Sequence, residues 1–361
     1  MSGALINLVS KGVQDAFITG DPQVSFFRQN YKRHTNFAMK PVEIQCIGVN
    51  APSAQLTFKV ENVGDLLAGV WIDFGVGTIG ITNAADTIQV AADRTPTSFE
   101  LWVGGKMIDR QDANYINMMW TKFLATTLTK SYSPQTPGQV SAAGQHWFPL
   151  HFFHCDNSTT TLPLVALQYQ EVEIRITQSP KTLSAAIPIR MFGEYIQLDT
   201  TERQWFTENT HDMLITQVQR IQADANGSDL IYLNHPVKAL MWGIDDGSNG
   251  HSDSKTDKVQ LYVNGTQYYN TPMPTGYFSS VNPYYHSENC NAPGTDPNVC
   301  MFSFALEANR HQPTGTLNFS RVDNAKLVWE TTGGADPLSL YAVNYNIFRI
   351  ESGLGGVRFS N

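Results

Sequence analysis

The sequence predicts an all-β protein of two consecutive eight-stranded antiparallel jelly rolls, a double jelly roll, with a short helix in a long loop of the first. Three observations support this fold class. Short apolar or alternating runs recur along the 361 residues, 27 glycines and 18 prolines separate them without a collagen-like period, and the order of features in the first half returns in the second. Since 42% of the residues are hydrophobic and 16% are charged, the chain can bury a substantial core.

The expected strands form two sets. Each run is bounded by Gly, Pro, Asn or Ser, as the strands of a sandwich are. The first set lies at 42–49, 54–60, 66–76, 98–105, 146–153, 171–178 and 190–198. The second lies at 213–223, 229–234, 237–244, 258–265, 300–307, 314–322, 325–332 and 340–350. Because the first set nearly completes one jelly roll and the count repeats, two rolls are expected.

The order of features within the two sets also repeats. A Trp-containing run, GVWIDFG or ALMWGID, precedes a polar loop and then a strand of the form LWVGG or LYVNG. Phe-rich strands and an aromatic closing strand follow in both halves, which favours an internal duplication. The predicted parts are an N-terminal segment at 1–38, the first roll at 39–199, a linker at 200–211 and the second roll at 212–361.

One helix is expected, at 112–128, after an Asp112 cap. Its apolar residues recur near helical spacing, at Tyr115, Met118, Met119, Phe123 and Leu124. The helix would lie inside a long loop, and loops of such length on a rigid sandwich are usually decoration or partner-binding surface.

Composition excludes some functions and environments. The formal charge of −8 argues against a general nucleic-acid binder, which needs a basic surface, so no direct contact with nucleic acid is expected. The four cysteines, at 46, 155, 290 and 300, include no CxxC pair and favour a reduced, intracellular origin. Cys290 and Cys300 could bridge across the loop between them, so their redox state is left open. No run reaches the roughly 20 apolar residues of a membrane span, and the N-terminal stretch lacks a signal-peptide core.

No catalytic pattern stands out, so an enzyme, a cofactor and a bound metal are not expected. His151, His154 and Cys155 in HFFHCDN resemble metal ligands. Side chains three apart on a strand point to opposite faces, however, so the two histidines should not converge on one ion. The acidic, Gly-rich stretch at 243–257 lacks the calcium-loop pattern and is interpreted as a surface loop.

Two kinds of surface feature are candidates for contacts outside the chain. Asn157 and Asn226 begin glycosylation sequons in a loop-like context. A basic cluster is formed by Arg28, Lys32, Arg33 and His34. It is either an ordinary surface turn or an inward-facing patch for an acidic partner or lipid headgroups.

Six stretches spread over nearly the whole chain carry a resemblance to a known family. They are GVQDAFITGDPQVSFFRQNYKRHTNFA (12–38), LPLVALQYQEVEI (162–174), LDTTERQWF (198–206), NHPVKALMW (234–242), RHQPTGTLNFSRVDNAKL (310–327) and YAVNYNIFRIESGLGG (341–356). In these stretches the chain resembles the double jelly-roll major capsid proteins of nucleocytoplasmic large DNA viruses, in particular those of algal viruses. The motifs occur in the same order along the chain as in that family.

The resemblance implies a structural function without catalysis. It implies a homotrimer with a pseudo-hexagonal outline that tiles an icosahedral shell over an internal membrane, because three subunits of two similar rolls give six comparable units around an axis. Neighbouring capsomers and minor capsid proteins would be its partners. The virion would be its location, after assembly in the host cytoplasm.

Positions follow from the same resemblance. The segment 12–38 should lie at the inner base of the capsomer, near the membrane, and the loops at about 110–145 and 270–299 should rise on the outer face. NFSRVDNAKL would form paired strands and a corner of the second roll, with Arg321, Asp323 and Asn324 as structural residues. The chain looks shorter than the relatives it resembles, which leaves its outer height and glycan decoration open.

Two other functions remain as alternatives. A glycan-binding jelly-roll module on a virion surface is favoured by Tyr268, Tyr269, Tyr284 and Tyr285 near the second outer loop. A cupin-like metalloenzyme would use His151 and His154.

Overall fold

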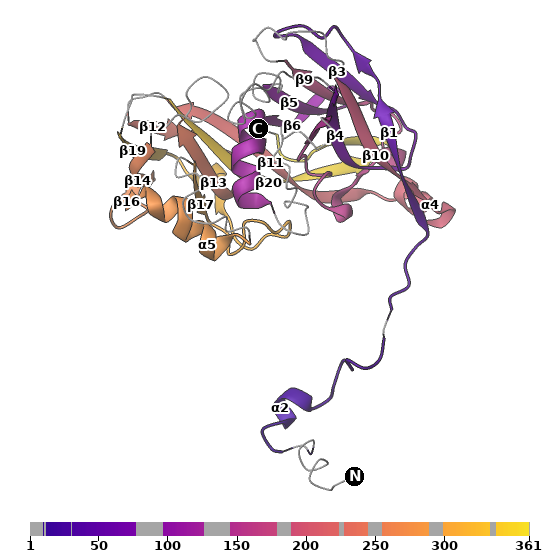
Figure 1. The fold of residues 1–361 in the computed structure, drawn as a ribbon, viewed down its shortest axis with the longest axis horizontal. Helices are drawn as coiled ribbons and strands as arrows, with labels where there is room; N and C mark the ends of the chain where they lie inside the picture. The colour runs from indigo at the N-terminus through magenta and orange to yellow at the C-terminus, as the bar shows by residue number, and fades with distance from the viewer. Residues whose placement is uncertain are drawn as a thin grey trace. The chain divides into compact units, whose positions relative to one another are not determined.

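The structure is a computed structural model that describes residues 10, 12–29, 31–76, 97–125, 145–178, 189–223, 227–244, 255–288, 299–332 and 337–360. The chain divides into two compact units, Met1–Asn36 and Phe37–Asn361. Within its described part, the first unit contains one short helix, α2 (Ala16–Thr19), and the second contains the strands (Figure 1). None of the described helices is long and apolar enough to cross a membrane.

The first roll consists of two antiparallel sheets. The sheet that we name the open sheet has the order β1 (Phe37–Ile44), β10 (Arg190–Leu198), β4 (Leu66–Val76) and β7 (Gln145–Pro149), with β8 (Leu162–Pro163) beside β4. The other sheet has the order β2 (Cys46–Ile47), β3 (Gln55–Val60), β9 (Val172–Thr177), β5 (Ser98–Val103) and β6 (Lys106–Asp112).

The second roll repeats this topology. The sheet that we name the wall sheet has the order β11 (His211–Ala223), β20 (Leu338–Glu351), β13 (Pro236–Ile244) and β17 (Val299–Ser303), with β18 (Leu317–Asn318) beside β13 and β21 (Leu354–Val357) beside β20. Its partner has the order β12 (Ser228–Ile231), β19 (Ala325–Thr332), β14 (Lys255–Val263) and β15 (Thr266–Gln267), with β16 (Met273–Pro274) beside β14. Apart from β2, β16 and β21, which have no counterpart in the other roll, the strand order of the described residues matches position by position, as the repeated features predict.

The repeated LWVGG and LYVNG motifs form equivalent hairpins. Gly104 and Gly105 have φ of 56° and 76°, and Asn264 and Gly265 have φ of 50° and 77°. A two-residue turn with positive φ at both positions suits the right-handed twist of a hairpin and favours Gly and Asn. These turns connect β5 to β6 and β14 to β15.

The helices differ from the prediction in two places. The helix expected at 112–128 is present as the shorter π-helix η1 (Tyr115–Leu124), and residues 126–128 lie outside the described part. Asp112 is not a cap, because it ends β6 and its carboxylate accepts a hydrogen bond from Arg220 at 2.8 Å. The predicted linker at 200–211 is largely a helix, α4 (Thr200–Glu208), whose Arg203 binds both oxygens of Asp65.

Short helical turns connect the remaining strands. They are η2 (Ser158–Thr160), η3 (Leu164–Ala166), η4 (Tyr277–Val281), α5 (Asn282–His286) and η5 (Phe319–Arg321). Both η3 and η5 follow a two-residue strand, β8 or β18, so this detail also repeats in the two rolls.

Two hydrophobic cores divide the side chains of the wall sheet between them. On β13, Leu240 and Trp242 point into the core of the second roll, whereas Ala239 and Met241 point into the larger core that contains the first roll. Alternation of side chains across a strand produces this division. The wall sheet is therefore buried on both faces, and Figure 1 shows β11 and β20 in the centre of the second unit.

Candidate functional site

The contact between the two rolls, which we name the junction, is formed by β6 of the first roll and by the wall sheet, in particular its strand β11. The buried carboxylate of Asp109 accepts a hydrogen bond from the Val218 backbone at 2.9 Å and another from Gln111 at 2.8 Å. Gln217 donates to the Ile108 carbonyl. Burial raises the pKa of Asp109 to about 6, although its hydrogen bonds oppose this change. The two rolls are thus joined by specific polar contacts as well as by apolar packing.

Aromatic pairs complete the junction. Phe153 of the first roll lies 5.7 Å from Phe348, and Tyr115 of η1 lies 5.7 Å from Tyr341, measured between ring centroids. Such pairs stabilise beyond the area they bury. One continuous core therefore connects both rolls.

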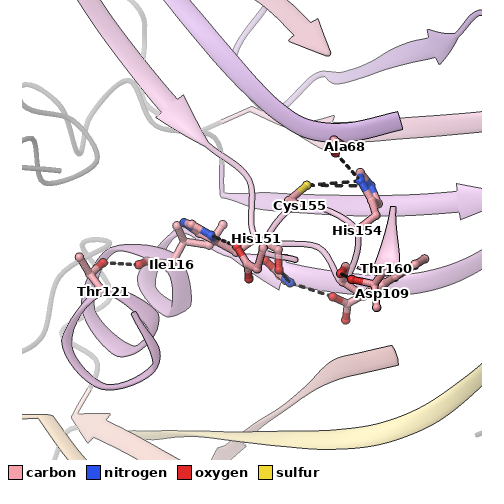
Figure 2. Close-up of polar contacts among 11 residues, drawn as sticks. Ala68, Asp109, Ile116, Thr121, His151, His154, Cys155 and Thr160 are labelled. Atoms are coloured by element: carbon pink, nitrogen blue, oxygen red, sulfur yellow. Dashed lines mark hydrogen bonds and ion pairs between the residues drawn. The ribbon is translucent and has the colours of Figure 1, made fainter. Parts of the chain in front are cut away.

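The histidine-rich turn follows β7, which ends at Pro149, so the expected strand at 146–153 is shorter than predicted. His151 stacks on Trp120 and contacts Asp156 at 2.9 Å. His154 contacts the Ala68 carbonyl at 2.8 Å, and Figure 2 shows the two rings beside different partners. The described residues contain no group of three or more His, Cys, Asp or Glu that could hold a metal ion.

His151 and His154 do not lie on a strand, so the prediction that a strand separates their side chains is wrong. What separates the two histidines is the turn itself, which sends each ring to its own partner. Burial lowers the pKa of His154 to about 4 and raises the pKa of the Cys155 thiol well above its usual range. The thiol is therefore protonated and unreactive at neutral pH.

The predicted basic cluster lies in the first unit. Its described side chains are exposed, at Arg28, Lys32, Arg33 and His34. Exposed aromatic residues accompany them, including Phe17, Phe26 and Phe27. Side chains of both kinds are therefore accessible to a partner, and the role of the cluster stays a prediction.

The corner at 317–325 differs from the expected paired strands. β18 pairs with β13 in the wall sheet, whereas β19 pairs with β12 and β14 in the other sheet, so the chain crosses between sheets. The Asn264 side chain accepts hydrogen bonds from the backbones of Asp323 and Asn324, at 2.9 and 3.2 Å. The structural role of the Arg321 and Asp323 side chains stays a prediction.

The other surface candidates have local roles. Asn157 caps η2 by accepting a hydrogen bond from the Thr159 backbone at 3.0 Å, while Asn226 and Cys290 lie outside the described residues. The rings of Tyr268 and Tyr269 are nearly perpendicular, with an interplanar angle of 88°. The two rings therefore do not form one flat surface.

The open sheet carries an apolar surface that was not predicted from the sequence. The register places Phe37 and Met39 of β1 on the same face as Phe192 of β10 and Trp71 of β4, opposite the core residues. Phe37 and Met39 are about half exposed, at 48% and 49%, and Trp71 stacks on Phe192 at 5.8 Å. The spacing of alternate apolar residues in these three strands was the available signal.

Comparison with known proteins gives two family matches. Residues 25–264 match the family described as major capsid protein N-terminus, and residues 202–356 match the family described as large eukaryotic DNA virus major capsid protein. Together they cover both rolls. Both are capsid families rather than enzyme families.

Individual relatives agree with the family matches. The chain is 33% identical over 405 residues to the major capsid protein of Pyramimonas orientalis virus and 28% identical over 445 residues to that of Paramecium bursaria Chlorella virus 1, with both proteins covered completely in each case. The chain also resembles the "PBCV-1 virus capsid, quasi-atomic model", with a TM-score of 0.79, 24% identity, and coverage of 93% of this chain and 100% of that one. The Faustovirus major capsid protein has a TM-score of 0.66 with 10% identity, covering 95% of each chain. The predicted double jelly-roll fold is confirmed.

Proposed function

Because this chain belongs to the major capsid proteins of large eukaryotic DNA viruses and is a structural part of the virion capsid, we propose that it assembles as a homotrimer. Its six rolls would form a pseudo-hexagonal capsomer that tiles an icosahedral shell. The comparisons give no support to the alternative glycan-binding module.

The observation that carries the trimer proposal is a difference in burial between equivalent sheets. In the wall sheet, the face bearing Ala239 and Met241 is covered by the first roll of the same chain. On the equivalent face of the open sheet, Phe206 of α4 covers Leu66, Ile196 and Leu198, but within the described residues no roll covers the part that bears Trp71 and Phe192. By the internal repeat, the matching cover for the open sheet is the roll of a second copy.

The chemistry of the open face suits a protein partner. It combines aromatic residues and a methionine with Arg190, which is paired to Asp73 at 2.6 Å and lies over the Phe192 ring. Aromatic residues, methionine and arginine are enriched in protein interfaces. The contact would be heterologous, and three copies related by a threefold axis would close it into a ring.

The domain division is part of the same proposal. We retain the first roll at 39–199, the linker at 200–211 and the second roll at 212–361. Support comes from strand pairing, since β1–β10 pair among themselves and β11–β21 do the same within the described residues. The large shared core makes the two rolls a single building unit rather than separate modules.

The N-terminal segment is proposed to face the inside of the shell. Its exposed aromatic side chains and its basic cluster suit an acidic or lipid surface there. Contacts with neighbouring capsomers and minor capsid proteins, and assembly in the host cytoplasm, belong to this proposal as well. Deleting 1–36 should leave the trimer intact and abolish binding to vesicles containing anionic lipid, measured by co-sedimentation; unchanged binding would contradict the membrane contact.

The trimer is tested by solution mass and by a charge placed on the open face. Light scattering should give three times 40.1 kDa, and negative-stain images of the same peak should have a hexagonal outline. Phe192→Glu should yield a folded monomer, because the charge would be buried on assembly. Tyr232→Glu, at an exposed position of the second roll, is the matched control and should remain trimeric. A wild-type monomer, or a trimeric Phe192→Glu variant, would refute the proposed interface.

A further inference from the structure

A lysine is buried at the junction, and no described residue accepts a hydrogen bond from its side-chain ammonium. Lys238 lies on β13, in the otherwise apolar run VKALMWGI, and its residue is only 5% exposed. Its ammonium lies 5.5 Å from the centre of the Tyr345 ring, and it makes no ion pair within the described residues. A buried charge of this kind costs folding free energy unless a counter-charge satisfies it.

The lysine borders a cavity of about 620 Å³ between the rolls. Trp120, Phe153 and Val343 supply apolar walls, and the residues Arg310 and Gln312 lie at an exposed part of the lining. The cavity is therefore large enough for a small molecule and accessible from the surface, next to the loop that carries the RHQ sequence.

The other charged groups around the cavity leave Lys238 without a dedicated partner. Asp156 is held by His151 at 2.9 Å, and Arg310 pairs with Glu307. His311 and Glu288 also line the cavity, and Tyr115 is the remaining titratable lining residue. Asp156 favours the charged form of Lys238 at a distance, yet burial prevails and lowers the pKa of Lys238 to about 8, so the amine is still mainly charged at neutral pH.

We propose that this cavity binds a small anion carrying a phosphate or carboxylate group, with the Lys238 ammonium as its main contact and Arg310 at its entrance. The anion would supply a negative charge beside Lys238, which makes no ion pair within the described residues. The aromatic and aliphatic walls of the cavity would exclude water and so strengthen the contact between the anion and Lys238. This site is separate from the open sheet, so it would bind its ligand in the monomer and in the trimer alike.

The first test measures binding of inorganic phosphate and, separately, of acetate to the full chain by calorimetry at constant ionic strength. Lys238→Met should weaken binding of the preferred probe at least tenfold. Lys326→Met removes an exposed lysine from β19 of the same roll and should leave the affinity unchanged. Preference for phosphate or for acetate identifies the chemical group that the site accepts.

The second test does not depend on a change in the core. Arg310→Ala alters an exposed residue and should weaken binding about threefold, whereas Arg321→Ala, also exposed, should not. Circular dichroism verifies that each variant is folded. If the wild type binds neither probe, or if Lys238→Met and Arg310→Ala bind as tightly as the wild type, the proposed site is wrong.

Discussion

The open sheet and the wall sheet have the same strand order but opposite surroundings. The run VKALMWGI in the wall sheet is buried on both faces, whereas RMFGEYIQL in the open sheet alternates between buried and more exposed positions. A sheet covered on both faces has nearly continuous apolar strands, and a sheet with one accessible face alternates. The two sheets thus share one strand order, while the burial of their side chains depends on what packs against each sheet.

The largest expected difference between the two sheets is in their tolerance of a charge. Met241→Glu buries a carboxylate at a fully buried position of the wall sheet and should lower the free energy of unfolding by about 4 kcal/mol or more, or prevent folding. Phe192→Glu in the open sheet should cost the isolated subunit no more than about 2 kcal/mol. Urea unfolding of both variants at a concentration where the chain is monomeric measures the difference, and equal losses would break the comparison.

The interior of the first roll should lose stability in acid through His154. Its pKa of about 4 in the folded protein lies below the ordinary value of 6.5, so the folded state disfavours the proton. Stability from this residue is complete above pH 6.5 and falls by about 3 kcal/mol as the pH drops to 4. His154→Gln should remove this dependence in urea unfolding, while the exposed His34→Gln should retain it. A His154→Gln variant that keeps the wild-type slope would contradict the assignment.

The stability contributed by Asp109 at the junction should change over the same pH range in the opposite direction. The pKa of Asp109 is about 6 in the folded protein and 3.8 ordinarily, so ionisation is disfavoured by folding. Its contribution is most favourable below pH 3.8 and declines by about 3 kcal/mol as the pH rises to 6. Asp109→Asn should therefore expose the acid sensitivity that Asp109 offsets in the wild type, measured as a steeper pH dependence of unfolding. Asp323→Asn, at an exposed position, serves as its control.

The smallest expected effect tests whether the two hairpins are equivalent. Gly105 and Gly265 have φ of 76° and 77°, and a Cβ at either position would meet no atom within 4 Å. Alanine at each should cost about 1–2 kcal/mol through backbone strain alone. Thermal unfolding should give the same loss for both variants, and a clear inequality would show that the repeated motifs have diverged in their turns.

The elements predicted best from the sequence are those that a local residue pattern determines. The runs at 190–198 and 325–332 coincide with β10 and β19, because each strand is flanked by residues that stop it. Helix α4 was missed because its sequence TTERQWFTE has almost no apolar stripe, and Phe206 is its contact with the small apolar group around Leu198. An isolated stripe of that size is too weak to signal a helix.

Contacts between distant segments could not be predicted. Asp323 and Asn324 mark a corner whether the chain returns within one sheet or crosses to the other, so only tertiary structure decides the pairing. The junction cavity depends on both rolls packing together, because residues of both line it. A lone Lys238 in an apolar strand was a visible signal for the cavity, since lysine is rarely buried.

The wall sheet has a consequence for the order in which the chain folds during synthesis. Strands β1–β10 precede β11–β21 in the chain, so the first roll leaves the ribosome complete before the doubly apolar strands appear. Those strands then meet a surface already formed to receive them. A circular permutant that begins at the second roll would present β13 and β20 with one face uncovered, and it should aggregate during translation even though its native structure is the same.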